Sequence, residues 1–503
     1  MAVIGLDFGN YNTFPCFIMD MDEDTRLGGK PDTLLPGNLK DGIPSVFFYS
    51  ERTGVLCGEN ALKTRAIPVE NRIRYLKGHL GESFTIGGRT FMYDDAITEV
   101  IQHCVRQANK RLEEAYHLTT NKISLSYPST YHYPEILRLV QLAQNATLSD
   151  GKTHLEVVGT IAEPAAAALD YLAGNPRKEE RTTALTYDLG GGTFDLALVS
   201  AYPRGRKNSR GKLYYYDKHA IGGDENIGGR LFDKAMEDLL LEKFSDIQLN
   251  KPNRDNLHNN AEKYKCDLSD EDEIVASIVV DDEYVYRTVT REEFEERTNE
   301  LLNSTIQQTK QFLEDHPDPR PDIIVLTGGA THMPQVMKQM KAAFPGYEIV
   351  SHDPSRAIAF GAVRYATNEI DNIQLRVSYD LGVRFFNGPE DQSGYFRPFI
   401  KAGTPIPCVS EDVISRISRE GCDSIRFSVY EANKANTDVH KLAEDYSEIM
   451  HVSIDFGKVV PRSTISISRM SVDERGKLTI EAWEESKSEK AAVRCDYVLK
   501  VKE

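Results

Sequence analysis

The chain has 503 residues, of which 40% are hydrophobic and 27% charged, and its formal net charge is −17 at pH 7. This composition is typical of globular proteins, and the length predicts two or three domains. The negative charge argues against nucleic acid as a partner, because no basic surplus is present to replace the counterions of phosphate groups.

Cysteine usage and hydropathy indicate the cellular compartment. The seven cysteines are scattered and form no C-x-x-C pair, which is typical of a reducing cytoplasm and argues against structural zinc. No basic stretch precedes an apolar core at the N-terminus, and no later run reaches the length of a membrane span. We therefore expect a cytoplasmic protein that does not enter a membrane.

The first predicted element is a β-hairpin in the segment IGLDFGNYNTFPCFI, residues 4–18. An apolar strand delivers Asp7 near its end, and Gly9 lets the chain turn with backbone N–H groups facing inward. A strand is predicted next over residues 43–50, and apolar residues at helical spacing predict a helix over residues 96–116. A strand at 122–131, a helix at 135–146, a strand at 156–164 and a helix at 165–174 continue an alternation that predicts an α/β fold.

The hairpin pattern returns in altered form as ALTYDLGGGTFDLALV, residues 184–199, where Asp188 and Gly190 match Asp7 and Gly9. Either copy alone is explained as well by an unrelated glycine-rich hairpin. Two such turns facing each other would make a phosphate-binding clamp, and the repeat favours this interpretation.

The second half contains a charged region and a further strand-turn-helix motif. Residues 234–314 predict helices with one inserted strand over 274–289. An apolar strand then runs into Gly328 and Gly329, and a helix begins near Pro334. A glycine pair beside a helix N-terminus suits an anion or a ribose, although a plain structural turn explains it equally well.

The remaining chain changes character. Small residues at Ala357, Ala359, Gly361 and Ala362 predict a helix that packs closely on a partner. After about residue 377, short runs such as ISIS and KLTIEAW alternate apolar and polar residues between turn signals. This pattern predicts an all-β region.

The order of these motifs resembles the actin-like ATPase superfamily, and most closely the DnaK-type heat-shock chaperones of the 70-kilodalton heat-shock protein family. The motifs are the first hairpin, AEPAAAALDY, the second hairpin, GGDENIGGRLFD, TGGATHMP and AFGAV, and weaker similarity continues through KAGTPIP, IRFSVYEAN and ISISRMSVDERGKLTIEAWEE. The resemblance implies a two-lobed α/β actin-like ATPase domain with a duplicated ribonuclease-H-like core, followed by a small all-β sandwich domain.

The resemblance also implies the domain boundaries. The ATPase domain would span residues 1–368, with a helical subdomain inserted at about 229–314, and a linker would follow over 369–376. A peptide-binding-like β-sandwich would span 377–503, without the helical lid of full-length family members. Because a lid slows the release of bound peptide, its absence predicts fast peptide exchange.

In this family ATP or ADP lies between two lobes with Mg²⁺. By resemblance, Asp7 and Asp188 hold the magnesium ion through water, and Glu163 and Asp195 orient the attacking water or its metal-bound neighbour. Glu163 is also explained as a helix-initiating carboxylate before a proline. The family's lysine near the γ-phosphate aligns with Arg74, which is therefore the fifth candidate catalytic residue.

The nucleotide-binding residues implied by the resemblance are Gly9, Asn10, Tyr11, Gly190, Gly191, Gly192, Thr193, Gly228, Gly229, Glu262, Lys265, Ser269, Gly328, Gly329 and His332. The spacing of Glu262, Lys265 and Ser269 places them on one helix face. Without the surrounding motifs, a solvated charged face would explain that helix.

Several positions depart from the family pattern. Cys266 and His332 replace two arginines that stack on adenine, which predicts weaker nucleotide binding. Asn10 and Tyr11 replace threonines of the first turn. Arg74 keeps a positive charge but adds bulk, so we expect binding to survive better than hydrolysis unless Lys77, three residues further on, takes this role.

The sequence therefore predicts an ATP-dependent molecular chaperone whose β domain binds extended apolar peptides. The expected partners are unfolded or extended polypeptides, with a J-domain co-chaperone and a nucleotide exchange factor as further candidates. Two alternatives stay open: a nucleotide-binding switch or scaffold with weak or lost hydrolysis, and a small-molecule kinase of the same superfamily.

Overall fold

The computed structural model describes residues 2–18, 32–36, 39, 42–63, 71–131, 133–175, 181–208, 211–366, 373–374, 376–377, 379–386, 394–402, 404–405, 407–416, 422–432, 446–461, 465–472, 477–484, 491–498 and 501–502. The chain forms two compact units, which comprise Met1–Tyr216 with Ile221–Asn372, and Asp217–Ala220 with Ile373–Glu503. Residues 369–372 and 375 of the predicted linker lie outside the described residues. None of the described helices has the length and apolar character needed to cross a membrane.

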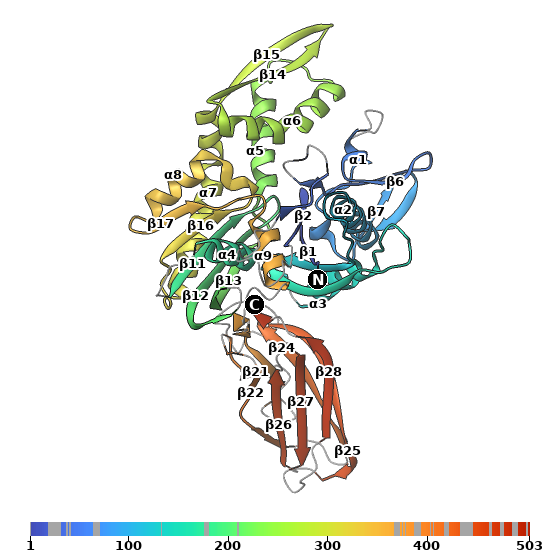
Figure 1. The fold of residues 1–503 in the computed structure, drawn as a ribbon, viewed down its shortest axis with the longest axis vertical. Helices are drawn as coiled ribbons and strands as arrows, with labels where there is room; N and C mark the ends of the chain where they lie inside the picture. Colours follow the sequence, from blue (N-terminus) through green and yellow to red (C-terminus); the bar gives the residue numbers. More distant parts are fainter. Residues whose placement is uncertain are drawn as a thin grey trace. The chain divides into compact units, whose positions relative to one another are not determined.

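The first sheet of the first unit is built around the first hairpin (Figure 1). Strands β1 (Ile4–Phe8) and β2 (Asn12–Phe17) pair antiparallel, as predicted, and β1 also pairs in parallel with β9 (Lys122–Tyr127). The strand order is β10-β9-β1-β2-β3. The other elements of this half are β3 (Asp32–Thr33), β4 (Ile43–Pro44), β5 (Phe47–Ser50), β6 (Gly54–Cys57), α1 (Glu59–Lys63), η2 (Leu76–His79), β7 (Ser83–Ile86), β8 (Arg89–Met92), α2 (Tyr93–Tyr116), α3 (Tyr133–Asn145) and β10 (Glu156–Ala162).

The second sheet of this unit repeats the arrangement. Strand β11 (Thr182–Leu189) pairs antiparallel with β12 (Phe194–Asn208) and in parallel with β16 (Ile323–Thr327). The order β17-β16-β11-β12-β13 matches the first sheet strand for strand, with β13 at Gly211–Asp224 and β17 at Glu348–Ser351. The repeat seen in the sequence thus extends from the two turns to the two sheets.

Two helices join the sheets through close packing. Helix α4 (Glu163–Gly174) contacts strands of the second sheet, α9 (Ala357–Ala366) contacts strands of the first, and the two helices contact each other. A Cβ on Gly361 would lie 2.7 Å from the Cα of Ala166 and overlap its carbonyl oxygen. The tight packing predicted from small residues is confirmed.

Helices and a hairpin follow β13. They are α5 (Gly229–Lys243), α6 (Lys251–Asp270), β14 (Glu273–Val280), β15 (Glu283–Thr290) and α7 (Arg291–Asp315), and η3 (Gly329–His332) and α8 (Pro334–Ala343) come after β16. The prediction of one strand over 274–289 is wrong, because β14 and β15 pair antiparallel. Asp281 and Asp282 adopt φ values of 49° and 66°. Aspartate tolerates this left-handed conformation, which suits a tight hairpin turn.

The single strand predicted over residues 43–50 is also interrupted. Its first part pairs with β2 and its second part with β6. Between them, the N–H of Ser45 donates to the carbonyl oxygen of Tyr11 over 2.8 Å. The backbone at this point therefore supports the first turn instead of continuing a strand.

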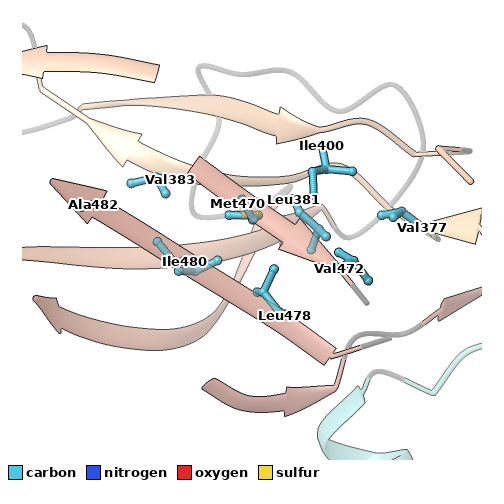
Figure 2. Packing of buried hydrophobic residues seen from close by; sticks show 10 residues of the cluster. Val377, Leu381, Val383, Ile400, Met470, Val472, Leu478, Ile480 and Ala482 are labelled. Carbon is cyan, nitrogen blue, oxygen red and sulfur yellow. The ribbon is translucent and has the colours of Figure 1, made fainter. Parts of the chain in front are cut away.

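The described elements of the second unit's long segment are all strands, as predicted. One sheet has the order β21-β20-β24-β25 and the other β22-β26-β27-β28, with β23 also paired to β26. Figure 2 shows the apolar core that the two sheets share, formed by Val377, Leu381, Val383, Ile400, Val429, Met470, Val472, Leu478, Ile480 and Ala482. The strands are β18 (Ile373–Gln374), β19 (Arg376–Val377), β20 (Leu381–Phe385), β21 (Tyr395–Ile400), β22 (Cys408–Val409), β23 (Val413–Arg416), β24 (Cys422–Ala432), β25 (Tyr446–Val460), β26 (Ile465–Val472), β27 (Lys477–Glu484), β28 (Ala491–Val498) and β29 (Val501–Lys502).

Candidate functional site

Both hairpins of the first unit close with the same turn. The N–H of Gly9 donates to the carbonyl oxygen of Asn12 over 3.1 Å, and the N–H of Gly190 donates to that of Thr193 over 3.0 Å. In each copy the strand carries its aspartate two residues before this glycine. The two segments are therefore equivalent in backbone hydrogen bonding as well as in sequence.

The two turns contact each other through Asn10 and Tyr11. A Cβ on Gly191 would lie 2.6 Å from Cε2 of Tyr11, and a Cβ on Gly192 would lie 3.1 Å from Cγ of Asn10. Only glycine leaves room for this approach. The expectation that the two turns face each other is confirmed.

The second turn rests on the N-terminus of α5. The N–H groups of Gly229 and Arg230 donate to the carbonyl oxygens of Gly190 and Gly191, each over 2.8 Å. Because the C=O and N–H of a trans peptide unit point in opposite directions, the N–H groups of Gly191 and Gly192 point away from α5. Backbone donors on that side of a glycine-rich turn suit a phosphate group.

Four buried carboxylates and one buried lysine lie beside these turns. Asp7 and Asp188 lie on β1 and β11, Glu163 begins α4 and Asp195 lies on β12, and none of them is more than 8% exposed. The amino group of Lys77 in η2 donates to a carboxylate oxygen of Glu163, and Lys77 is only 4% exposed. Glu163 thus starts a helix and also belongs to the charged cluster.

The structure brings Lys77, and not Arg74, to these carboxylates. Arg74 instead forms an ion pair with Glu262 over 3.4 Å, and the two side chains are 30% and 43% exposed. Tyr75, which precedes η2, has a positive φ of 58°, so the chain changes direction between the two cations. Of the two cations considered for the γ-phosphate, the structure therefore places Lys77 beside the carboxylates, and the catalytic role of either residue stays a prediction.

The electrostatics of the cluster favour a bound cation. Burial and the charge of Glu163 raise the pKa of Asp7 to about 7, although Lys77 offsets part of this rise. Burial and then the charge of Asp195 hold the pKa of Asp188 well above its ordinary value. Burial and Glu163 raise the pKa of Asp195 to about 6. One lysine does not balance four carboxylates.

Two serines that the sequence did not single out support the cluster. The hydroxyl of Ser126 donates to Oδ1 of Asp7 over 3.1 Å. The N–H of Ser129 donates to Oδ1 of Asp195 over 2.8 Å, and its hydroxyl donates to the same oxygen. Both serines lie in or just after β9, which pairs in parallel with β1. The sequence does contain a signal for these serines. They are polar residues near the carboxyl end of β9, the strand beside β1, which carries Asp7.

The donor set fits magnesium held through water. Oδ1 of Asp188 and Oδ1 of Asn10 are buried and have no hydrogen-bond partner among the described residues. No group of three His, Cys, Asp or Glu side chains in the described part of the chain is placed to ligate an ion directly. Magnesium keeps several of its waters in proteins, and these waters would donate to such oxygen atoms.

The candidate nucleoside residues lie on and near α6. Lys265 forms an ion pair with Asp233 of α5 over 2.6 Å. The hydroxyl of Ser269 donates to the carbonyl oxygen of Lys265 over 3.5 Å. Glu262 lies one turn before Lys265 and carries the contact to Arg74. Asp233 is the last residue of the motif GGDENIGGRLFD, but it was not among the site residues predicted from the sequence.

The glycines of the motifs GGDENIGGRLFD and TGGATHMP differ in how closely other atoms approach them. A Cβ on Gly328, whose φ is 84°, would overlap Oδ1 of Asp188, and a Cβ on Gly228 would lie 2.7 Å from the backbone N of Thr193. Gly329 has open space around its missing side chain. His332 and Cys266 are both exposed. Gly228 and Gly328 are thus both required by a close approach to the second hairpin, Gly328 at Asp188 and Gly228 at Thr193.

Comparison with protein families gives a match over most of the chain. The model of the family described as Hsp70 protein matches residues 143–500, more than two thirds of the chain. The matched range contains Glu163, the second turn, α5, α6 and the strands β18 to β28 of the second unit, whereas the first turn and Lys77 precede it.

Proposed function

The chain belongs to the Hsp70 family, whose members are ATPases that generally act as ATP-dependent chaperones, and we propose that it performs this role itself. In this proposal, the first unit binds and hydrolyses ATP, and its nucleotide state controls peptide binding by the second unit. The observation that carries the proposal is the cluster of four buried carboxylates and Lys77 beside two equivalent glycine turns.

Phosphoryl transfer needs groups that position the nucleotide and stabilise charge on the phosphate oxygens. The N–H groups of Gly191 and Gly192 hold the phosphates, and Asp7 and Asp188 hold Mg²⁺ through its waters. When bound, magnesium neutralises charge on the transferred phosphoryl group.

The remaining members of the cluster act on the reacting groups. Lys77 contributes a buried positive charge for the terminal phosphate, and its ion pair with Glu163 fixes its position. Asp195, with a pKa of about 6, is mostly ionised at pH 7, so it accepts a hydrogen bond from the attacking water. Ser129 holds this carboxylate in place through two hydrogen bonds.

The second unit is proposed to bind extended apolar polypeptide. The short strands β22 and β23 lie beside β26 at one edge of their sheet. Val409 and Ile414 on these strands are 63% and 59% exposed. An edge strand offers unpaired backbone N–H and C=O groups that can form hydrogen bonds with an extended peptide. Neighbouring apolar side chains add contacts that require little of the peptide's sequence.

We place this activity in the cytoplasm. Among the described residues, Cys16, Cys57, Cys104, Cys266 and Cys408 are all free thiols. Free thiols are typical of a reducing compartment. J-domain proteins and nucleotide exchange factors are the co-chaperones to test there.

A second candidate function is a nucleotide-dependent switch with weak or lost hydrolysis. The exposed Cys266 and His332 stand where the family pattern has adenine-stacking arginines. Cysteine provides no planar cation, and histidine provides one only when protonated. If nucleotide binding is weak and hydrolysis is slow, the main activity would be a change of conformation when nucleotide binds.

A single-turnover measurement of ATP conversion to ADP separates these functions. We expect conversion that an apolar peptide stimulates and that Asp188→Asn abolishes, while Asp315→Asn, at an exposed site in α7, leaves it unchanged. Nucleotide binding without conversion would favour the switch. Stimulation by glucose instead of peptide would favour a small-molecule kinase and refute the proposal.

A further inference from the structure

The side chain of Tyr11 crosses from the first turn to the opposite side of the candidate nucleotide site. Its ring packs directly against the backbone of Gly191 in the second turn. The ring of Tyr75 meets it edge-on, with ring centroids 5.1 Å apart and planes at 87°. The aromatic ring therefore occupies space directly beside the second turn.

A chain of polar contacts holds this side chain in place. The hydroxyl of Tyr75 donates to the hydroxyl of Tyr11 over 2.7 Å, and Tyr11 donates to Oδ2 of Asp233. Lys265 pairs with Oδ1 of the same carboxylate over 2.6 Å. We call Tyr75, Tyr11, Asp233 and Lys265 the Tyr11 latch.

The hydrogen bond from Tyr11 to the Asp233 carboxylate is a charge-assisted interaction. Burial, and then the neighbouring charge of Asp233, raise the pKa of Tyr11 far above its ordinary value. The phenol therefore stays protonated and continues to donate to the carboxylate. A hydrogen bond to an ionised group is about twice as strong as one between neutral groups.

We infer that Tyr11 gates the nucleotide site, an inference that rests on the proposed nucleotide-binding function. A phosphate held by the N–H groups of both turns needs the space that the ring fills. Lys265 and Asp233 lie beside Glu262 in the region proposed for the nucleoside, so the latch uses groups of the binding site itself. Nucleotide binding therefore requires the latch to open.

This gate has a quantitative consequence. When only a fraction of the molecules is open, the apparent affinity for nucleotide falls by that fraction, and so does the association rate. Removing the hydroxyl of Tyr11 weakens the closed state by one hydrogen bond to a charged group. Such a bond contributes enough to stability for a change of about tenfold or more in the open fraction.

The test is stopped-flow binding of a fluorescent ADP analogue with Mg²⁺. The variants are Tyr11→Phe, which keeps the ring, and Tyr11→Thr, which removes it. Tyr116→Phe is the matched control, because the hydroxyl of Tyr116 also donates to an aspartate, Asp32, over 2.8 Å, in a contact that involves neither turn. Thermal unfolding followed by circular dichroism verifies that each variant is folded.

We expect Tyr11→Phe to associate at least about tenfold faster than wild type, Tyr11→Thr to associate faster still, and Tyr116→Phe to match wild type. Equal association rates in wild type and Tyr11→Phe would overturn the gate while leaving nucleotide binding established. Absence of binding in wild type and in both Tyr11 variants would overturn the proposed function together with the gate. If Tyr11→Thr does not fold, the comparison of Tyr11→Phe with Tyr116→Phe still decides the question.

Discussion

Replacing Lys77 by methionine tests whether it is the cation of the carboxylate cluster. Methionine keeps most of the side-chain volume and removes the charge together with the hydrogen-bond donors of the amino group. Lys77 forms a buried ion pair with Glu163, and removing one partner of a buried pair destabilises a protein by about 3–5 kcal/mol. Arg74→Met is the matched control, because the Arg74–Glu262 pair is 30% and 43% exposed, and exposed pairs contribute about 0–1 kcal/mol.

The effect of Lys77→Met should grow with pH. The pKa of Asp7 rises from 3.8 to about 7 in the folded protein, so the folded state binds more protons than the unfolded state between these values. Stability from this group is therefore lost as pH rises through that window, by about 4 kcal/mol at 1.36 kcal/mol for each pKa unit. Lys77 lowers the pKa of Asp7, and its removal extends the loss above pH 7. We expect a smaller difference from wild type at pH 5 than at pH 8.

Urea unfolding at pH 5, 7 and 8 provides the measurement. The described helices all belong to the first unit, so far-ultraviolet circular dichroism at 222 nm follows that unit. Trp483 is the only tryptophan of the chain and lies in the second unit, so its fluorescence is an internal control. Equal destabilisation by Lys77→Met and Arg74→Met, or a Lys77→Met effect that does not change with pH, would refute the assignment.

Three further predictions concern the metal, the base and the helix packing. Asp188→Asn should abolish Mg²⁺-dependent turnover, and turnover within about threefold of wild type would contradict the metal assignment. The same substitution should raise the free energy of unfolding at pH 8 in the absence of nucleotide, because it removes a buried carboxylate whose pKa is raised by burial. Cys266→Arg combined with His332→Arg should tighten ATP binding about tenfold through restored stacking, and calorimetry showing unchanged affinity would contradict it. Gly361→Ala should lower the free energy of unfolding by about 3 kcal/mol or more because its Cβ overlaps the backbone of α4, whereas Gly174→Ala, with nothing within 4 Å, should have little effect.

The features that the sequence predicted well are those set by local chemistry. Asp7 with Gly9 and Asp188 with Gly190 identified two equivalent hairpins, because an aspartate and a glycine at fixed spacing determine the local turn. The small residues around Gly361 identified a close helix contact for the same reason. In these cases the residues themselves dictate the backbone that the structure contains.

The features that the sequence missed depend on contacts between distant segments. The choice between Arg74 and Lys77 was open because the positive φ of Tyr75 reorients the chain between them, and no pattern in the sequence signals that conformation. The bond between Tyr11 and Asp233 joins residues 222 positions apart. Such contacts arise only after the two sheets and the helical region inserted between β13 and β16 are in place.

The position of Lys77 bears on one expectation about activity, which stays a prediction. From Arg74, Cys266 and His332 we expected nucleotide binding to survive better than hydrolysis. Lys77 now occupies the buried position beside Glu163, so the groups proposed for the chemical step are all present. The departures that remain include Tyr11, Cys266 and His332, which are proposed to affect nucleotide binding.

Weak nucleotide binding and slow hydrolysis are thus expected to have separate causes in this chain and to be measurable separately. If Tyr11 limits entry and the lost arginines weaken the hold on adenine, then a low ATPase rate at low ATP reflects low occupancy. Occupancy rises with ATP concentration, but the rate of the chemical step does not. A single-turnover rate that approaches a finite plateau only at high ATP would support an intact catalytic cluster behind a gated site. A negligible plateau at saturating ATP would instead show that the buried carboxylates and Lys77 no longer promote hydrolysis, and the switch would become the better description of this chain.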